Sequence, residues 1–238
     1  MTTVVEWLFR PAAQALGYEL IRSGADAGPG GGAKQFEYRA ADGTFDYKAY
    51  RDAQVKGNRE KLDRVWAQEE NIKFLADFVQ ARRPDPTFGL CHGTRRGLEQ
   101  TWFRDALDCE VIGTEISDTA AEFPHTIQWD FHEVKPEWEG AADFIYSNSL
   151  DHSFDPKLAL NRWMSCLKPG GLCLIEHSSW DEPEYVDAMD PFGASLSLLP
   201  YLILEWGEGK FAAREIVDLP VVRKGLAYLK VIVIQNAE

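Results

Sequence analysis

The fold is decided by a stretch that begins with FGLCHGTRRG at Phe88–Gly97. It continues with VIGTEIS at Val111–Ser117, TIQWD at Thr126–Asp130, FIYSNS at Phe144–Ser149 and LCLIE at Leu172–Glu176. Each piece is a short apolar run that ends in a polar or acidic turn, which predicts five β-strands. Glycines after one strand and acids after the next are typical of an open parallel sheet that binds an adenosine-like ligand. The order of these strands therefore favours a small-molecule enzyme.

The regions around these strands predict an α/β fold. Helices are expected at residues 98–107, at 157–167, and from 194 to 204 with a start near Pro191. Strands that alternate with helices predict a parallel sheet covered on both faces. Two further strands are expected at 210–219 and 226–234. The gap between them is too short for a helical crossover, so they should form an antiparallel hairpin.

The N-terminal part predicts two further units before a sheet domain at 84–238. Residues 1–44 combine a short amphipathic helix at 1–22 with a glycine-rich linker at 23–34, which lacks the Gly-Lys-Ser/Thr of a phosphate loop. Residues 45–83 form a helical cap, with helices expected at 45–66 and 69–82. The N-terminal 44 residues either fold over the site or pair with another subunit, which would make a homodimer.

The amino-acid composition argues against several classes of ligand and partner. The net charge of −13 over 238 residues argues against a nucleic-acid-binding surface, which needs clustered Lys and Arg. The four cysteines form no C-x-x-C pair, so we expect reduced thiols and no zinc site. We expect a cytoplasmic protein, because there is no signal-peptide pattern and no run near the roughly 18 apolar residues of a membrane span.

Three strand ends carry the residues from which we infer a ligand site. Gly93 lets a ligand approach the turn after the first strand, and the following amides favour a carboxylate or phosphate. Glu115 lies 22 residues further on, where a carboxylate can accept both ribose hydroxyls of a nucleoside. Asp130 ends the third strand and could bind an adenine amino group, with Trp129 or Phe131 packed on the ring. Each also has a purely structural interpretation, as a tight turn or a solvated acid.

Three motifs resemble those of class I S-adenosylmethionine-dependent methyltransferases. They are GTEIS at Gly113–Ser117, DFIYSNSLDHSFDP at Asp143–Pro156 and LKPGG at Leu167–Gly171. The resemblance implies a Rossmann-like, doubly wound, seven-stranded sheet that is mostly parallel with an antiparallel C-terminal hairpin. It also implies S-adenosyl-L-methionine as the cofactor and transfer of its methyl group.

The resemblance also assigns the cofactor-binding residues. It places Glu115 on the ribose, Asp130 near the adenine, and Asn148 and Ser149 near the methionine portion. The full expected set is Gly93, Thr94, Arg95, Glu115, Ile116, Trp129, Asp130, Phe131, Asn148 and Ser149. The first motif departs from the family, which usually has an acid and three alternating glycines. Here Gly89 takes the acid position, Cys91 and Arg95 take two glycine positions, and Arg95 or Arg96 could meet the methionine carboxylate.

Methyl transfer depends mainly on alignment, and a general base helps only where the acceptor must lose a proton. His152, assisted by Asp151, is the first candidate base, His177 is the second and His92 the third. A histidine at a strand end often only caps a loop, and that alternative stays open for each. Trp180 could line the acceptor pocket or pack under a lid.

The acceptor class rests on a weaker resemblance. Residues 7–22 loosely resemble the leader segments of bacterial enzymes that modify surface polysaccharides. We therefore expect O-methylation of a glycan or another small polar molecule. Two competing functions are a non-catalytic binding or scaffold protein, suggested by the altered first motif, and a nicotinamide-dependent oxidoreductase. The second is disfavoured because no G-x-G-x-x-G follows the first strand.

Overall fold

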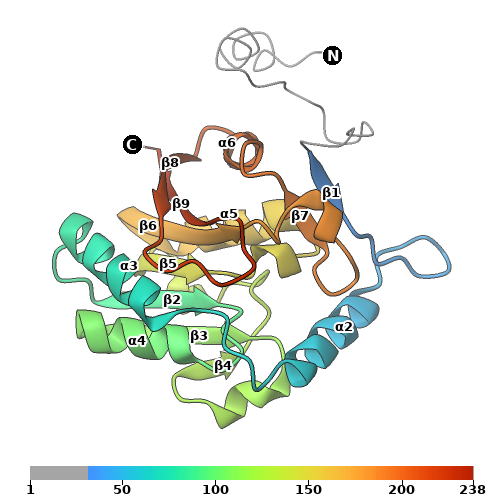
Figure 1. Cartoon of the computed structure of the whole chain (residues 1–238), viewed down its shortest axis with the longest axis horizontal. Helices are drawn as coiled ribbons and strands as arrows, with labels where there is room; N and C mark the ends of the chain where they lie inside the picture. The colour runs from blue at the N-terminus through green and yellow to red at the C-terminus, as the bar shows by residue number, and fades with distance from the viewer. Residues whose placement is uncertain (1–31, 238) are drawn as a thin grey trace, which may run out of the picture.

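The computed structural model describes residues 32–237 (Figure 1). The helix expected at 1–22 and most of the glycine-rich linker lie outside the described residues. The strands are β1 Ala33–Gln35, β2 Phe88–His92, β3 Glu110–Glu115, β4 Thr126–Gln128, β5 Ala142–Ser147, β6 Leu167–Ser178, β7 Phe192–Ala194, β8 Phe211–Asp218 and β9 Leu229–Asn236. The α-helices are α2 Tyr47–Glu60, α3 Glu69–Arg82, α4 Leu98–Leu107, α5 Pro156–Cys166 and α6 Leu199–Gly207.

Seven of the strands form one sheet in the order β4-β3-β2-β5-β6-β9-β8. The pairs from β4 to β6 are parallel, and β9 runs antiparallel to both β6 and β8. This confirms the expected mostly parallel, seven-stranded sheet with an antiparallel hairpin. None of the helices within residues 32–237 combines the length and apolar character needed to cross a membrane.

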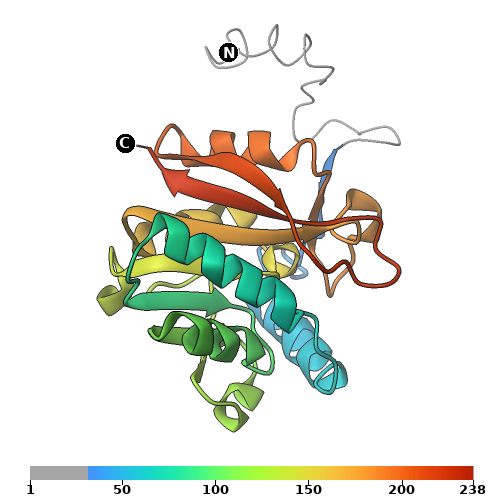
Figure 2. The same ribbon diagram turned by 60° about the vertical axis from the view of Figure 1, so that its left-hand side comes forward.

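Alternate residues of the central strands face two separate apolar layers. On one face, Phe144 and Tyr146 of β5 pack against α3 and α4 through side chains such as Leu75 and Phe103. On the other face, Ile145 packs in the layer built with α5 and α6. Figure 2 shows α3 and α4 lying side by side along the sheet. Both faces are covered, as the alternation of strands and helices predicted.

Two sequence-based expectations in the cap and linker need correction. The first cap helix ends at Glu60 and not at Trp66, because the Lys61 amide turns back to the carbonyls of Gly57 and Asn58. The chain then runs without helix to Gln68. The linker was expected to stay unordered through residue 34, yet Ala33–Gln35 forms β1, which pairs with β7 in a separate two-stranded sheet.

The helix expected at 194–204 is also displaced. Residues 192–194 form β7 because they pair antiparallel with β1. Helix α6 begins at Leu199, and its first turn contains Pro200, whose missing amide costs nothing there. The predicted start at Pro191 was therefore wrong, because the competing pairing comes from residues more than a hundred positions earlier.

Candidate active site

The strand ends predicted to bind a ligand open onto two adjoining cavities. The small cavity, of about 50 Å³, is lined by Gly93, Arg95, Glu115, Ile116, Asp130, Phe131, Ser149, His152, Met189 and by Tyr50, Gln54, Gly57, Asn58 and Lys61 from α2 and its end. The large cavity, of about 450 Å³, shares five of these residues, Lys61, Gly93, Arg95, Ser149 and His152. Because of this shared lining, the two cavities form one continuous site at the carboxyl edge of the sheet.

The turn after β2 requires glycine at residue 93. Its φ is +73°, and an added Cβ would lie 2.5 Å from both Cβ and Oγ of Ser149. The Ser149 hydroxyl in turn donates to the Gly93 carbonyl at 3.1 Å. The altered first motif thus keeps its glycine where the backbone closely approaches Ser149, just after β5.

Arg95 takes a position where the family usually has glycine, and it keeps a glycine-like backbone with φ of 43°. Its amide donates to Oε2 of Glu115 at 3.1 Å, and its guanidinium reaches the Arg64 carbonyl at 3.3 Å. The other altered positions are packed. A Cβ at Gly89 would lie 2.4 Å from the Phe144 ring, and Cys91 is buried in the core. The three altered positions are therefore accommodated by a left-handed backbone at Arg95 and by packing at Gly89 and Cys91.

Glu115 and Asp130 line the same small cavity. The second Glu115 oxygen, Oε1, accepts from the Ser117 amide at 3.0 Å. Burial raises the pKa of Glu115 above its usual value, although these two amides oppose the rise. Each carboxylate oxygen can accept more than one hydrogen bond, so Glu115 keeps acceptor capacity toward the cavity.

Asp130 belongs to a network that the sequence did not reveal. Oδ1 accepts from the amide of His132 at 2.9 Å and lies 2.7 Å from its Nδ1, and Oδ2 accepts from the Tyr47 hydroxyl at 2.8 Å. Burial would raise the pKa of Asp130, but these hydrogen bonds and His132 outweigh it and lower the pKa. Asp130 is therefore ionised and held rigidly.

The two aromatic candidates beside Asp130 have different positions. Phe131 lines the small cavity. Trp129 lines neither cavity; it packs edge-on against Trp138, with ring centroids 6.0 Å apart, and donates from its indole to the Glu133 carbonyl. Of these two candidates, only Phe131 is placed to pack on a ring bound in this cavity.

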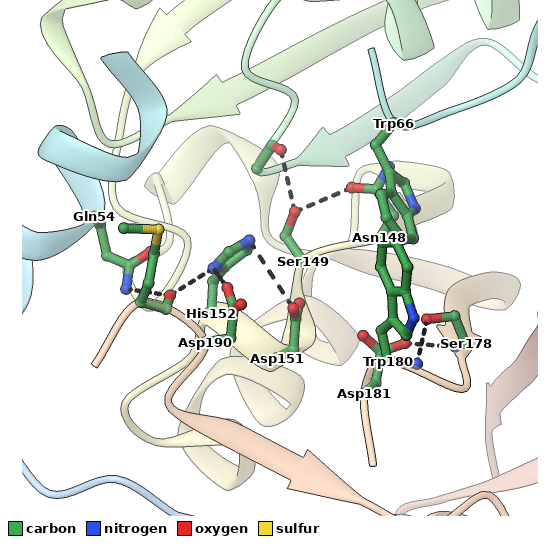
Figure 3. Close-up of polar contacts among 12 residues, drawn as sticks. Gln54, Trp66, Asn148, Ser149, Asp151, His152, Ser178, Trp180, Asp181 and Asp190 are labelled. Atoms are coloured by element: carbon green, nitrogen blue, oxygen red, sulfur yellow. Dashed lines mark hydrogen bonds and ion pairs between the residues drawn. The ribbon is translucent and has the colours of Figure 1, made fainter. Parts of the chain in front are cut away.

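His152 lines both cavities and lies between two carboxylates (Figure 3). Its Nδ1 is 2.9 Å from the Met189 carbonyl and 3.1 Å from Asp190, and its Nε2 is 4.0 Å from Asp151. Burial would lower the pKa of His152, but Asp151 and Asp190 together raise it above the usual value. The pairing of His152 with Asp151 was predicted, whereas the contribution of Asp190 was not.

The other two candidate histidines do not line either cavity. His177 is buried, with Nδ1 3.7 Å from Asp181, and burial lowers its pKa to about 4. His92 is buried and stacks on Trp163 with centroids 5.0 Å apart, and burial lowers its pKa to about 3. Of the three candidate bases, the structure brings only His152 to the cavity.

The large cavity brings together the remaining predicted residues and several unpredicted ones. It is lined by Thr94, Arg96, Leu98, Glu99, Asn148, Asp151, Trp180, Asp181, Asp190 and Arg223, and by residues 64–66. Thr94 Oγ1 and, in the small cavity, Asn58 Nδ2 are buried without a hydrogen-bond partner in the described part of the chain. Such unpaired polar atoms beside a cavity are available to a polar ligand.

Glu99 is the most unusual of the unpredicted residues. It lies in the first turn of α4, and the Asn148 amide donates to its Oε1 at 3.4 Å. Burial raises the pKa of Glu99 to about 7. Its position after the glycine turn is the only sequence signal for it. Asp190 and Arg223 come from loops without a recognisable motif.

Comparisons with known proteins agree with this architecture. Residues 90–175 match a family model described as a methyltransferase domain. No curated protein matches the chain at the level of sequence.

Solved structures resemble the chain in fold. The 1,6-didemethyltoxoflavin-N1-methyltransferase of Burkholderia thailandensis is 17% identical with a TM-score of 0.60, over 80% of this chain and 88% of that one. The geranyl diphosphate C-methyltransferase of Streptomyces coelicolor is 12% identical with a TM-score of 0.56, over 79% of this chain and 98% of that one. Both were solved with S-adenosylhomocysteine. The predicted resemblance is thus confirmed: residues 90–175 match a methyltransferase-domain model, and the chain has the fold of these S-adenosylmethionine-dependent methyltransferases.

Proposed function

We propose that this protein is an S-adenosyl-L-methionine-dependent methyltransferase that O-methylates a small polar molecule or glycan. The observation that carries the proposal is the placement of Glu115 and Asp130, from neighbouring strand ends, on one small cavity that continues into the large one. The small cavity suits the adenosine portion, and the large cavity suits the methionine portion and the acceptor.

The chain's own residues fit the cofactor. Glu115 has free acceptor capacity for ribose hydroxyls, and Phe131 and Ile116 supply apolar contact for the adenine. Asn58 Nδ2 and Thr94 Oγ1 are donors on the same site that have no hydrogen-bond partner among the described residues. Gly93, Arg95, Asn148 and Ser149 surround the expected methionine portion, where a guanidinium can pair with a carboxylate. Residues 45–83 serve as a cap, since α2 supplies one wall of the small cavity.

When bound, S-adenosyl-L-methionine supplies an activated methyl group, so the protein's task is alignment and proton removal. Nε2 of His152 accepts the proton of the acceptor hydroxyl, while Met189 and Asp190 hold Nδ1 and orient the ring. Asp151 and Asp190 stabilise the imidazolium that forms. O-methylation is the reaction for which such a base is useful.

Substitution of Glu115 tests the cofactor assignment. We expect Glu115→Gln to weaken binding of S-adenosylhomocysteine at least tenfold, since hydrogen bonds to a charged group contribute about 1.5–3 kcal/mol. Isothermal titration calorimetry measures this directly. Glu110→Gln, at the opposite end of the same strand, should bind like the unchanged protein. No detectable binding by the unchanged protein would sink the proposal, and retained cofactor with no turnover on any hydroxyl acceptor would favour a non-catalytic binding role.

A further inference from the structure

We propose that the acceptor is an anion that carries a planar ring, bound at the mouth of the large cavity between Arg223 and Trp180. This inference rests on the proposed function and specifies the chemical class of its substrate. The protein as a whole has a net charge of −13, so a concentration of unpaired positive charge in one cavity calls for a reason.

Arg223 shows this lack of pairing most clearly. Its guanidinium donates to two backbone carbonyls, those of Val65 at 2.8 Å and Trp66 at 3.1 Å. No carboxylate forms an ion pair with Arg223 within residues 32–237. A guanidinium has five N–H donors, and two carbonyls leave most of them, together with the full positive charge, available to a ligand.

Other cations of the cavity repeat this arrangement. Arg95 donates to the Arg64 carbonyl and Arg96 to the Asp63 carbonyl, at 3.3 and 3.4 Å. The backbone carbonyls of residues 63–66 therefore accept hydrogen bonds from three guanidiniums, those of Arg95, Arg96 and Arg223. None of the lining cations Lys61, Arg64, Arg95, Arg96 and Arg223 forms an ion pair with a carboxylate in the described part of the chain. Backbone carbonyls thus hold the guanidiniums of Arg95, Arg96 and Arg223, and no ion pair neutralises them in this part of the structure.

The carboxyl groups of the same cavity compensate this charge only in part. They are Glu99, Asp151, Asp181 and Asp190. Burial raises the pKa of Glu99 to about 7, and burial also raises the pKa of Asp151 and Asp181. Asp151 and Asp190 flank His152, where they stabilise a positive ring. The arginine side of the cavity thus keeps a positive potential that favours an anion.

A pair of tryptophans lies beside Arg223. The rings of Trp66 and Trp180 are 5.8 Å apart, and the Arg223 guanidinium lies 4.9 Å from the centroid of Trp66. Trp66 is fixed by its indole N–H, which donates to Glu176 at 2.7 Å. Trp180 is 45% exposed although it lines the cavity, and Figure 3 shows it beside Trp66 and Asn148. An exposed indole next to a guanidinium suits a planar ring that carries an anionic substituent.

Four matched probes, titrated by calorimetry into the protein saturated with S-adenosylhomocysteine, test this. They are 4-hydroxybenzoate, 4-hydroxyphenyl phosphate, the neutral 4-hydroxybenzamide and the non-planar anion trans-4-hydroxycyclohexanecarboxylate. We expect at least one of the two planar anions to bind tenfold or more tightly than the amide and the cyclohexane analogue. The carboxylate and phosphate arms show which anion the site prefers.

Substitutions show which side chains produce the preference for a planar anion. Arg223→Gln should remove the preference for the anion over the amide, Arg223→Lys should retain part of it, and Trp180→Leu should remove the preference for a planar ring. Arg214→Gln on β8, which lines neither cavity, is the matched control. All four should bind S-adenosylhomocysteine like the unchanged protein, and this also shows that they are folded.

The outcomes separate the two proposals. Equal affinity for the planar anions and the amide, or no binding by either planar anion, overturns the inference while cofactor binding leaves the proposed function intact. A preference that survives Arg223→Gln also overturns it. If S-adenosylhomocysteine itself does not bind, the proposed function fails, and titration of the free protein with the same probes still decides the anion preference.

Discussion

Arg95 has the backbone conformation that glycine normally occupies, with φ of 43°. For a residue with a Cβ this conformation costs roughly 1–2 kcal/mol, whereas glycine costs about 0.5–1 kcal/mol in chain entropy. We therefore expect Arg95→Gly to change the free energy of unfolding by less than about 1 kcal/mol. Affinity for S-adenosylhomocysteine should fall about tenfold, because the guanidinium lines both cavities.

Calorimetry and thermal denaturation of the Arg95→Gly variant check this pair of effects. Asp108→Gly is the matched control, since Asp108 has φ of 50° at the end of α4 and lines neither cavity. It should leave affinity unchanged. If Arg95→Gly bound S-adenosylhomocysteine as tightly as the unchanged protein, Arg95 would not contribute to cofactor binding.

His152 gives a prediction about protonation. The carboxylates of Asp151 and Asp190 raise its pKa, so its neutral, proton-accepting form is populated only as the pH rises past the usual histidine value. Replacing Asp190 by Asn removes a charge that favours the imidazolium. The pKa of His152 should therefore fall, and the acid limb of the rate profile should move to lower pH.

Nuclear magnetic resonance titration of the His152 ring measures this pKa directly, and Asp218→Asn on β8 serves as the control. A pKa in Asp190→Asn equal to or above that of the unchanged protein would contradict the assigned role of Asp190.

At the scale of elements, the turn between β2 and α4 depends on Gly93. An alanine there would have to adopt a positive φ, and its Cβ would lie 2.5 Å from Ser149. The turn after β2 and the residues after β5 would therefore have to separate. We expect Gly93→Ala to lose at least 2 kcal/mol of stability, about the upper end of the φ cost alone, and to lose cofactor binding. Gly140→Ala should lose only the stability that its positive φ costs, because no atom of residues 32–237 lies within 4 Å of its added Cβ. Chemical denaturation should separate the two variants, and equal losses would show that the contact with Ser149 is unimportant.

The success of sequence-based prediction varied among the elements for a physical reason. Helices at 69–82 and 98–107 were predicted with their observed bounds, because their apolar periodicity and flanking turns are local. Strand β7 was missed because its partner, β1, is distant in sequence. Trp66, expected as the last residue of the first cap helix, lies outside it and donates to Glu176, which is likewise a distant partner.

At the scale of the whole molecule, buried acids make stability depend on pH. The pKa of Glu99 is raised from about 4.5 to about 7, so its protonated form is favoured in the fold. The resulting penalty is absent below the unfolded-state pKa and grows as the pH rises from about 4.5 to 7. Glu99→Gln should therefore stabilise the protein at pH 8 by on the order of 3 kcal/mol and have little effect at pH 4.

Urea denaturation at the two pH values tests this, with Glu110→Gln as an exposed control. A gain of equal size at both pH values would contradict the assignment, because it would not depend on ionisation.

Site residues could be predicted from the sequence only where the strand topology alone brings them together. The carboxyl ends of neighbouring parallel strands must meet at one edge, so Gly93, Glu115, Asp130 and Ser149 could be grouped from the sequence. Tyr47, Glu99, His132, Asp190 and Arg223 could not, because a helix start, a helix turn and three loops bring them there through tertiary packing. The burial that raises the pKa of Glu99, and the placement of Asp151 and Asp190 that raises the pKa of His152, are likewise invisible in one sequence.

The place of β9 in the sheet has a consequence for assembly. It follows β8 along the chain yet lies between β6 and β8, and within residues 32–237 β8 has no other neighbour in the sheet. Strand β8 can therefore join the sheet only by pairing with β9, which is synthesised after it. The two strands must pair with each other before or while β9 docks against β6. A chain interrupted after Asp218 would leave the hydrogen-bonding edge of β6 uncovered, and such an edge invites association with other chains.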